Sequence, residues 1–365
     1  MMRPIAVVLV VACASTPQPA PAPAAQPSAP PPAQPAAPTA ELPAFHTEEL
    51  GTGLYAFLYP ETHGAIVSGN SLVVVGDAAA LVVDSGHFPS HAAQMIEQIQ
   101  RWTQLPVRWL VNTHWHPDHN AGNGAFRRAF PGVAIISTTP TRDDILNVLP
   151  KKELTERQIA GVLAEHPRDE AERRYHDKVA AELTAFLPEL RAAEHVAPDT
   201  TFAERRVVDL GHRTVTLAFL GRGNTAGDAV VWVPDARLLA TGDLIVHPVP
   251  YPFGSFIGEW IATLRKLRGF DATTIVPGHG PVMHDMQFVD RTIALLSELK
   301  AQVDRVAATG ASLDDTRAKV KVDALRAQFV GDDRDRAFFF DHGFLATAIR
   351  RAYREAKSGP LQDQD

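Results

Sequence analysis

The order of hydrophobic and polar positions predicts strands and helices that alternate along most of the chain. From Phe45 onward, short apolar and β-branched runs recur between turn residues, and each run predicts a buried strand. The predicted strands are Leu54–Leu58, Asn70–Val75, Ala80–Val83, Val107–Val111, Val133–Ser137, Arg206–Leu210, Thr214–Phe219, Ala229–Val233, Leu238–Thr241 and Thr274–Val276. This alternation is typical of an α/β protein.

Helical spacing of apolar residues fills the intervals between several of these strands. Ser90 is expected to cap a helix that continues to Trp102, and a second helix covers roughly Phe256 to Leu267. Residues 141–195 are rich in Glu, Arg, Lys, Ala and Leu, which predicts a helical insertion. Residues 286–365 are expected to form a helical C-terminal extension.

Two segments of the chain resemble each other in pattern. Val73–Asp77 leads through a turn into a strand that ends at Asp84, and Val231–Asp235 leads into a strand that ends at Asp243. Each half therefore delivers an aspartate from the end of a strand. This suggests two β-rich halves whose sheets pack together, with helices outside.

Composition narrows the possible classes of protein. With 365 residues, 45% of them hydrophobic, the chain has enough apolar material for a large core. A net charge of −7 argues against a nucleic-acid partner, and a single cysteine excludes a disulfide framework. No protein partner is evident from the sequence.

The first 13 residues are typical of an export signal. A charged Met1–Arg3 start precedes a short apolar run, and Val10–Cys13 resembles a bacterial lipobox. We expect lipidation of Cys13, and hence a lipid-anchored protein of the bacterial cell envelope that faces the periplasm. The alternative is ordinary cleavage after the small residues 12–14, which would leave no cysteine in the mature protein; the intact mass of the mature protein distinguishes the two.

Residues 14–44 form a Pro/Ala-rich segment. Ten of the chain's 29 prolines lie between Pro17 and Pro38, and such a composition cannot bury a core. We interpret this segment as a disordered tether between the anchor and a domain at 45–285.

The candidate chemistry is concentrated in one hexapeptide, His114-Trp115-His116-Pro117-Asp118-His119. It directly follows a predicted buried strand. Because alternate residues of an extended segment point the same way, His114 and His116 can face one cation, while Asp118 and His119 turn toward a second position. Imidazole and carboxylate ligands suit zinc, and also iron or manganese.

This hexapeptide resembles the H-x-H-x-D-H signature of the metallo-β-lactamase fold superfamily. Asp84, which precedes the hexapeptide, and Asp243 and His279, which follow it, match further landmarks of the superfamily in order. The resemblance implies an αββα sandwich of two mixed β-sheets flanked by helices, with one or two zinc ions. It implies His114, His116, Asp118, His119, Asp243 and His279 as ligands, with Asp84 supporting the site from behind.

One landmark of the superfamily is missing, because Asn224 stands where a histidine ligand of the first metal position is expected. Three hypotheses follow. The Asn224 amide oxygen ligates with lower affinity; His247 substitutes for the missing histidine; or only the second position, with Asp118, His119, Asp243 and His279, is tightly filled.

The implied activity is hydrolysis by metal-bound hydroxide, since a divalent metal lowers the pKa of its water from about 15.7 toward 7. Asp118 is the candidate catalytic residue, which orients the nucleophile and moves its proton. We expect a small ester, thioester, lactone or lactam as substrate. An aspartate at position 243 disfavours a dedicated β-lactamase, which stays an alternative, as does a non-catalytic metal-binding envelope protein.

Two further segments are candidates for substrate contact. The loop from Pro60 to Gly69 carries His63 and is a possible flap over the site. The stretch from Val246 to Trp260 is aromatic, and it either lines a pocket beside the metals or buries a helix face.

Overall fold

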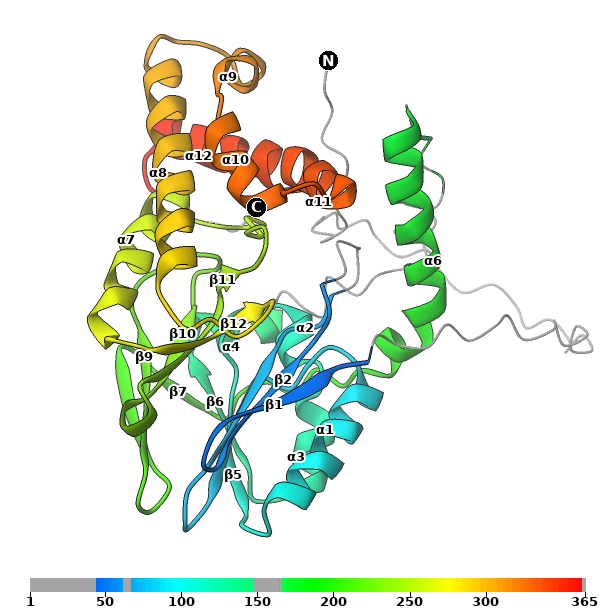
Figure 1. Cartoon of the computed structure of the whole chain (residues 1–365), viewed down its shortest axis with the longest axis vertical. Helices are drawn as coiled ribbons and strands as arrows, with labels where there is room; N and C mark the ends of the chain where they lie inside the picture. Colours follow the sequence, from blue (N-terminus) through cyan, green and yellow to red (C-terminus); the bar gives the residue numbers. More distant parts are fainter. Residues whose placement is uncertain (1–43, 62–66, 148–163, 165, 168, 363–365) are drawn as a thin grey trace, which may run out of the picture.

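The computed structural model describes residues 44–61, 67–147, 164, 166–167 and 169–362. Two mixed β-sheets pack against each other, and helices cover the outer side of each (Figure 1). The predicted αββα sandwich, with its C-terminal helices, is therefore confirmed. Position 13, the tether and His63 lie outside the described residues, so the predictions made for them stay predictions.

The first sheet has seven strands that lie in chain order from β1 to β7. The neighbours from β1 to β4 are antiparallel and those from β4 to β7 are parallel. Its strands are β1 (His46–Gly51), β2 (Leu54–Leu58), β3 (Ser71–Val75), β4 (Ala80–Val83), β5 (Val107–Val111), β6 (Ala134–Thr138) and β7 (Thr200–Phe202).

The second sheet has five strands in the order β12-β11-β10-β9-β8, of which only β11 and β12 are parallel neighbours. Its strands are β8 (Arg205–Asp209), β9 (Thr214–Phe219), β10 (Ala229–Val233), β11 (Leu238–Val246) and β12 (Thr274–His279). Parallel neighbours need crossover connections, which is why helices lie on the outer faces.

The main core lies between the two sheets. Inward-facing aliphatic side chains of the first sheet, such as Leu72 and Val111, share one buried cluster with Leu217 and Val231 of the second. These side chains alternate along their strands with residues that face the helices, as the strand period of two requires. Burial on both faces explains why inner strands such as β4 and β10 appear in the sequence as continuous apolar runs.

Helices complete the outer layers. On the first sheet, α1 (Pro89–Trp102) and α3 (Asn123–Ala129) bury Met95, Ile99 and Phe126. On the second sheet, α7 (Ile257–Leu267) and α8 (Gln287–Ala308) pack together with the C-terminal helices. Those helices are α9 (Leu313–Lys319), α10 (Asp323–Val330), α11 (Arg334–Phe339), the π-helical η4 (Phe340–Leu345) and α12 (Ala346–Ser358).

Most of the described residues between β6 and β7 are helical. This segment contains α4 (Thr139–Asn147) and α6 (Glu170–Ala192), and α6 stands beside the sandwich in Figure 1. Within the described ranges, none of the helices has the length and apolar character needed to cross a bilayer.

Several boundaries differ from prediction. Ser90 does not cap α1, because the helix begins at Pro89, with Phe88 as its N-cap; proline is well suited to a first helical turn. The strand predicted to end at Thr241 continues to Val246, so Asp243 lies within β11 rather than at its end. Similarly, β12 continues to His279.

Candidate metal centre

The predicted ligands come together at one edge of the sandwich. His114, His116, Asp118 and His119 follow the end of β5, and the last two lie on the short helix α2 (Pro117–Asn120). Asp243 and His279 come from the neighbouring strands β11 and β12 of the second sheet. The gap outside the carboxyl ends of parallel strands is the usual place for a site in an α/β fold.

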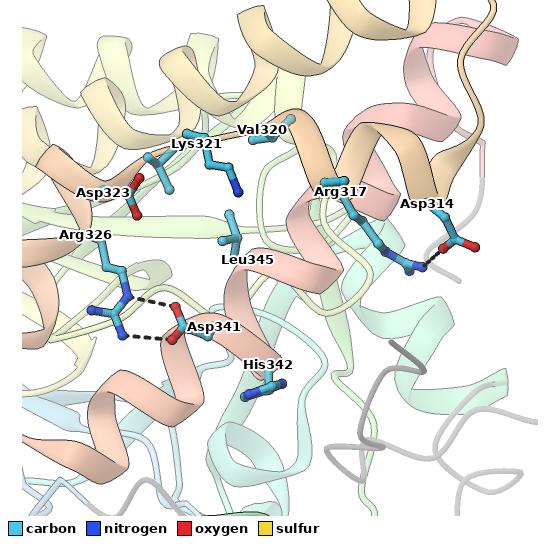
Figure 2. Close-up of a pocket in the computed structure, with 11 residues that line it drawn as sticks. Asp314, Arg317, Val320, Lys321, Asp323, Arg326, Asp341, His342 and Leu345 are labelled. Carbon is cyan, nitrogen blue, oxygen red and sulfur yellow. Dashed lines mark hydrogen bonds and ion pairs between the residues drawn. The ribbon is translucent and has the colours of Figure 1, made fainter. Parts of the chain in front are cut away.

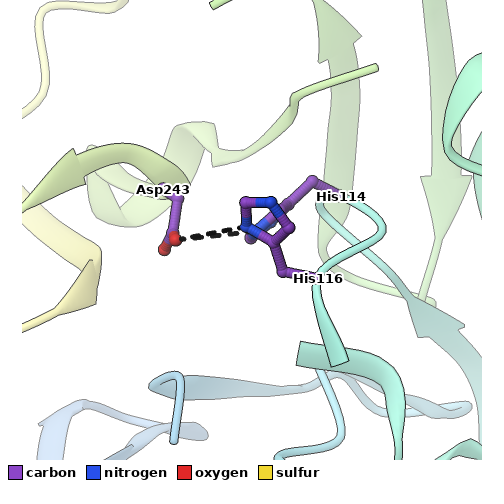
Figure 3. Close-up of side chains that lie close together, drawn as sticks. All are labelled: His114, His116 and Asp243. Carbon is purple, nitrogen blue, oxygen red and sulfur yellow. Dashed lines mark hydrogen bonds and ion pairs between the residues drawn. The ribbon is translucent and has the colours of Figure 1, made fainter. Parts of the chain in front are cut away.

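The first cluster consists of His114, His116 and Asp243 (Figure 3). Nε2 of His114 lies 3.0 Å from Nδ1 of His116, and these nitrogens lie 3.5 Å and 3.9 Å from Oδ2 of Asp243. All three side chains are buried. Two imidazole nitrogens and one carboxylate oxygen therefore converge on a single point.

The second cluster consists of Asp118, His119 and His279. Nε2 of His279 lies 3.0 Å from Oδ2 of Asp118, and Nε2 of His119 lies 3.4 Å from the same oxygen. The two imidazole Nε2 atoms are 3.3 Å apart. This donor set also suits a divalent metal.

Asp243 links the two clusters. Its Oδ2 faces the first, whereas its Oδ1 lies 3.1 Å from Nε2 of His119 and 3.4 Å from Nε2 of His279. A carboxylate placed in this way can bridge two metal ions, as expected from the superfamily resemblance.

Asp84 belongs to neither cluster but forms hydrogen bonds that orient ligands of both. Its Oδ1 accepts the backbone N–H of Thr113, and its Oδ2 accepts the Thr113 hydroxyl, each at 2.8 Å. Oδ2 also lies 2.8 Å from Nδ1 of His119. Because a carboxylate only accepts, His119 carries its proton on Nδ1 and leaves Nε2 for the metal. Asp84 has a left-handed backbone with φ 57°, a strained conformation of the kind found at functional sites.

Thr113 links Asp84 to His114 and so fixes the orientation of the His114 ring as well. Because its hydroxyl donates to Asp84, its oxygen accepts from Nδ1 of His114, 3.0 Å away, which directs Nε2 of His114 toward the first cluster. Gly242 permits this contact, since a Cβ at that position would lie 2.6 Å from the Thr113 hydroxyl oxygen. Nothing in the sequence pattern had distinguished Thr113.

The carboxylates of the site remain ionised. Burial acts to raise the pKa of Asp243, but the surrounding imidazoles, His279 first among them, outweigh it and hold this pKa well below its ordinary value. In Asp118, burial is likewise outweighed by His119 and His279, and the pKa is well below its ordinary value. Both side chains can therefore serve as anionic ligands.

The histidines respond differently to their surroundings. Burial lowers the pKa of His116 to about 4, so its ring is neutral and offers a lone pair at neutral pH. Burial acts to lower the pKa of His119 as well, but Asp243, Asp118 and Asp84 raise it well above its ordinary value. A cation is therefore favoured beside these carboxylates, whether it is a proton or a metal.

Asn224 is buried in the loop between β9 and β10. Its Nδ2 donates to the carbonyl of Tyr251, which fixes the orientation of the amide. Its Oδ1 is buried and has no hydrogen-bond partner among the described residues. An orphaned oxygen at the position of the missing histidine fits an oxygen ligand for a metal.

His247 lies outside both clusters. Its ring packs against Phe288 at a centroid distance of 4.8 Å, and burial together with Arg336 and Arg291 lowers its pKa to about 4. The structure therefore gives the substitution by His247 no geometric support.

We expect Asn224→His to increase the metal content of the purified protein by about one zinc per chain, because imidazole binds zinc more strongly than an amide does. His247→Ala is the matched comparison and is expected to leave metal content unchanged. Elemental analysis after dialysis measures both. Loss of metal in His247→Ala, or no gain in Asn224→His, would contradict this expectation.

The aromatic stretch after β11 is divided between the core and the neighbourhood of the second cluster. Phe256 and Trp260 are fully buried in the core beside the second sheet. Tyr251 and Phe253 are only half-buried, and the Tyr251 ring lies 5.3 Å from that of His279. Burial raises the pKa of Tyr251 well above its ordinary value, with Asp243 and Asp118 adding to the effect.

A cavity of about 820 Å³ lies elsewhere, among the C-terminal helices (Figure 2). Arg326 pairs there with Asp341 through bonds of 2.7 and 2.8 Å, and Arg317 pairs with Asp314 at 3.0 Å. These paired charges largely neutralise one another, and the lining contains no residue of either cluster. The candidate chemistry therefore belongs to the metal centre.

A sandwich with paired His/Asp clusters at one edge defines the class of metal-dependent hydrolases with this architecture. Residues 64–279, more than half of the chain, match the family model of the metallo-beta-lactamase superfamily. The chain belongs to this superfamily.

Individual relatives are distant. The linear primary-alkylsulfatase of Pseudomonas sp. is 24% identical over 235 residues, covering 61% of this chain but only 43% of that protein. The metallo-beta-lactamase type 2 of Bacillus sp. is 22% identical over 226 residues, 60% of this chain and 70% of that protein. A solved metallo-beta-lactamase from Pontibacter korlensis superposes with a TM-score of 0.51 at 21% identity, covering 69% of this chain and 99% of that one.

Proposed function

We propose that this protein is a hydrolase that uses one or two bound zinc ions to cleave a small ester, thioester, lactone or lactam. The observation that carries the proposal is the position of Asp243, whose two oxygens face the two clusters separately. When bound, a divalent metal acidifies water and polarises the group under attack.

The protein's own residues would then divide the work. His114, His116 and the Asn224 oxygen would hold the first metal position, Asp118, His119 and His279 would hold the second, and Asp243 would serve both. Asp118 is the candidate to orient the attacking water and take up its proton, since its carboxylate is ionised and retains slight solvent exposure. Asp84 keeps the histidine nitrogens aimed at the metals.

The candidate substrates differ in the type of bond that would be hydrolysed. The Bacillus relative, a metallo-beta-lactamase, supports lactams as an alternative substrate class, and the Pseudomonas relative adds sulfate esters. The aspartate at position 243 favours an ester or thioester over a lactam.

We expect the zinc-loaded protein to hydrolyse the ester p-nitrophenyl acetate faster than a chromogenic cephalosporin, which is a lactam, because an aspartate at position 243 favours esters. A chelator should abolish turnover, and added zinc should restore it. Release of p-nitrophenol and cephalosporin absorbance measure the two reactions, with p-nitrophenyl sulfate as a third substrate. Efficient cephalosporin turnover would instead identify a β-lactamase, and a fully loaded protein without any turnover would identify a non-catalytic metal-binding protein.

A further inference from the structure

Two half-buried aromatic side chains lie together on the loop between β11 and α7. The rings of Tyr251 and Phe253 are 6.2 Å apart, and the Tyr251 ring lies 5.3 Å from that of His279 in the second cluster. The residues that alternate with them, Pro252 and Gly254, are buried. We call Tyr251 and Phe253 the aromatic lip.

Side chains from two distant parts of the chain form hydrogen bonds to the backbone of the lip and of the residues that follow it. The Asn224 amide donates to the Tyr251 carbonyl. Arg351 of α12, fully buried, donates to the carbonyls of Ser255 at 2.7 Å and Gly254 at 3.1 Å. Asn224 and Arg351, the latter 96 positions from Ser255 in sequence, therefore hold this loop in place, and its aromatic rings are preorganised beside the metal centre.

The C-terminal extension packs against the lip. Phe339 meets the Tyr251 ring edge-on at 5.3 Å. The same helix, α11, is tied to other parts of the fold, since Arg336 forms two bonds of 3.0 Å with Glu61. Arg174 of α6 bonds to Asp335 at 2.8 Å. Helix α11 therefore connects the C-terminal extension to the segment after β2 and to α6, and through Phe339 it also contacts the lip.

We propose that the aromatic lip determines specificity by binding an apolar group of the substrate next to the second cluster. This inference rests on the proposed hydrolase function and deepens it. A fixed aromatic surface that is half-exposed beside polar ligands gains affinity from every apolar carbon that it covers. The favoured substrates therefore carry an extended apolar acyl or alkyl group, and short polar substrates bind weakly.

Binding of ethylphosphonate and n-octylphosphonate to the zinc-loaded protein tests the proposal without turnover. Calorimetry should show n-octylphosphonate binding about 20-fold tighter or more, since each buried methylene contributes. Phe253→Ser is expected to reduce this ratio about fivefold and to leave the metal content unchanged. Phe253→Leu, which stays apolar, should largely restore the ratio.

Phe270→Ser is the matched control, because Phe270 is also half-buried but packs against Trp232. Its ratio should equal that of the wild type. An equal ratio in Phe253→Ser and wild type, or a wild-type ratio near one, would overturn the proposal even if esters are hydrolysed. Suppose instead that the affinity ratio of the two phosphonates depends on Phe253 but the protein hydrolyses none of the substrates. The hydrolase function would then be overturned, while the binding role of the aromatic lip would stand.

Discussion

Asp243→Asn is expected to lower kcat/KM for ester hydrolysis about a thousandfold, a loss of about 4 kcal/mol of transition-state stabilisation. Asp243 is the one described side chain whose two oxygens face both clusters. A neutral amide would offer one oxygen and one NH2 group, so at least one cluster would meet a donor in place of a ligand. We therefore expect the metal content to fall together with activity.

The experiment combines elemental analysis with steady-state kinetics at several zinc concentrations. Asp209→Asn is the control, because Asp209 is an exposed aspartate of β8. It should keep both metal and activity. If excess zinc restored wild-type kcat to Asp243→Asn, the carboxylate would serve only metal retention. Full metal content with unchanged turnover would rule out the shared role of Asp243.

The strands were predictable where burial is continuous and were missed where it is not. Ala80–Val83 lies between layers and all of its residues are apolar and buried, so its sequence alone identifies it. The edge strand β1 has the sequence HTEELG, is mostly exposed, and exists because it pairs with β2. In β11, the polar Gly242 and Asp243 interrupt the apolar run, yet pairing with β12 continues to Val246.

The same distinction applies to the metal centre. His114 to His119 are neighbours in sequence, and their spacing already indicates metal binding. Thr113 and Arg351 carry no such signal, because their importance comes from partners brought near by folding, namely Asp84 and Ser255. Contacts that are distant in sequence have no local pattern, so only the folded chain shows them.

Asp84→Asn is expected to weaken zinc binding 10- to 100-fold, although Asp84 belongs to neither cluster. Asp84 accepts from the Thr113 N–H, the Thr113 hydroxyl and His119 Nδ1. An amide in its place must direct an N–H group at one of these donors. The ring of His119 then loses its fixed orientation, and the Thr113 contact to His114 is disturbed in the same step. Titration against a competing chelator measures the affinity.

Asp199→Asn provides the matched comparison, because the Asp199 carboxylate also accepts a backbone N–H, that of Ile135 at 3.1 Å, but it contacts no ligand. It should bind zinc like the wild type. Thermal unfolding of the metal-free proteins separates the two ways in which Asp84→Asn can act. Equal stability with weaker zinc binding would show that Asp84 orients the ligands, whereas unchanged zinc affinity would show that the histidines keep their geometry without it.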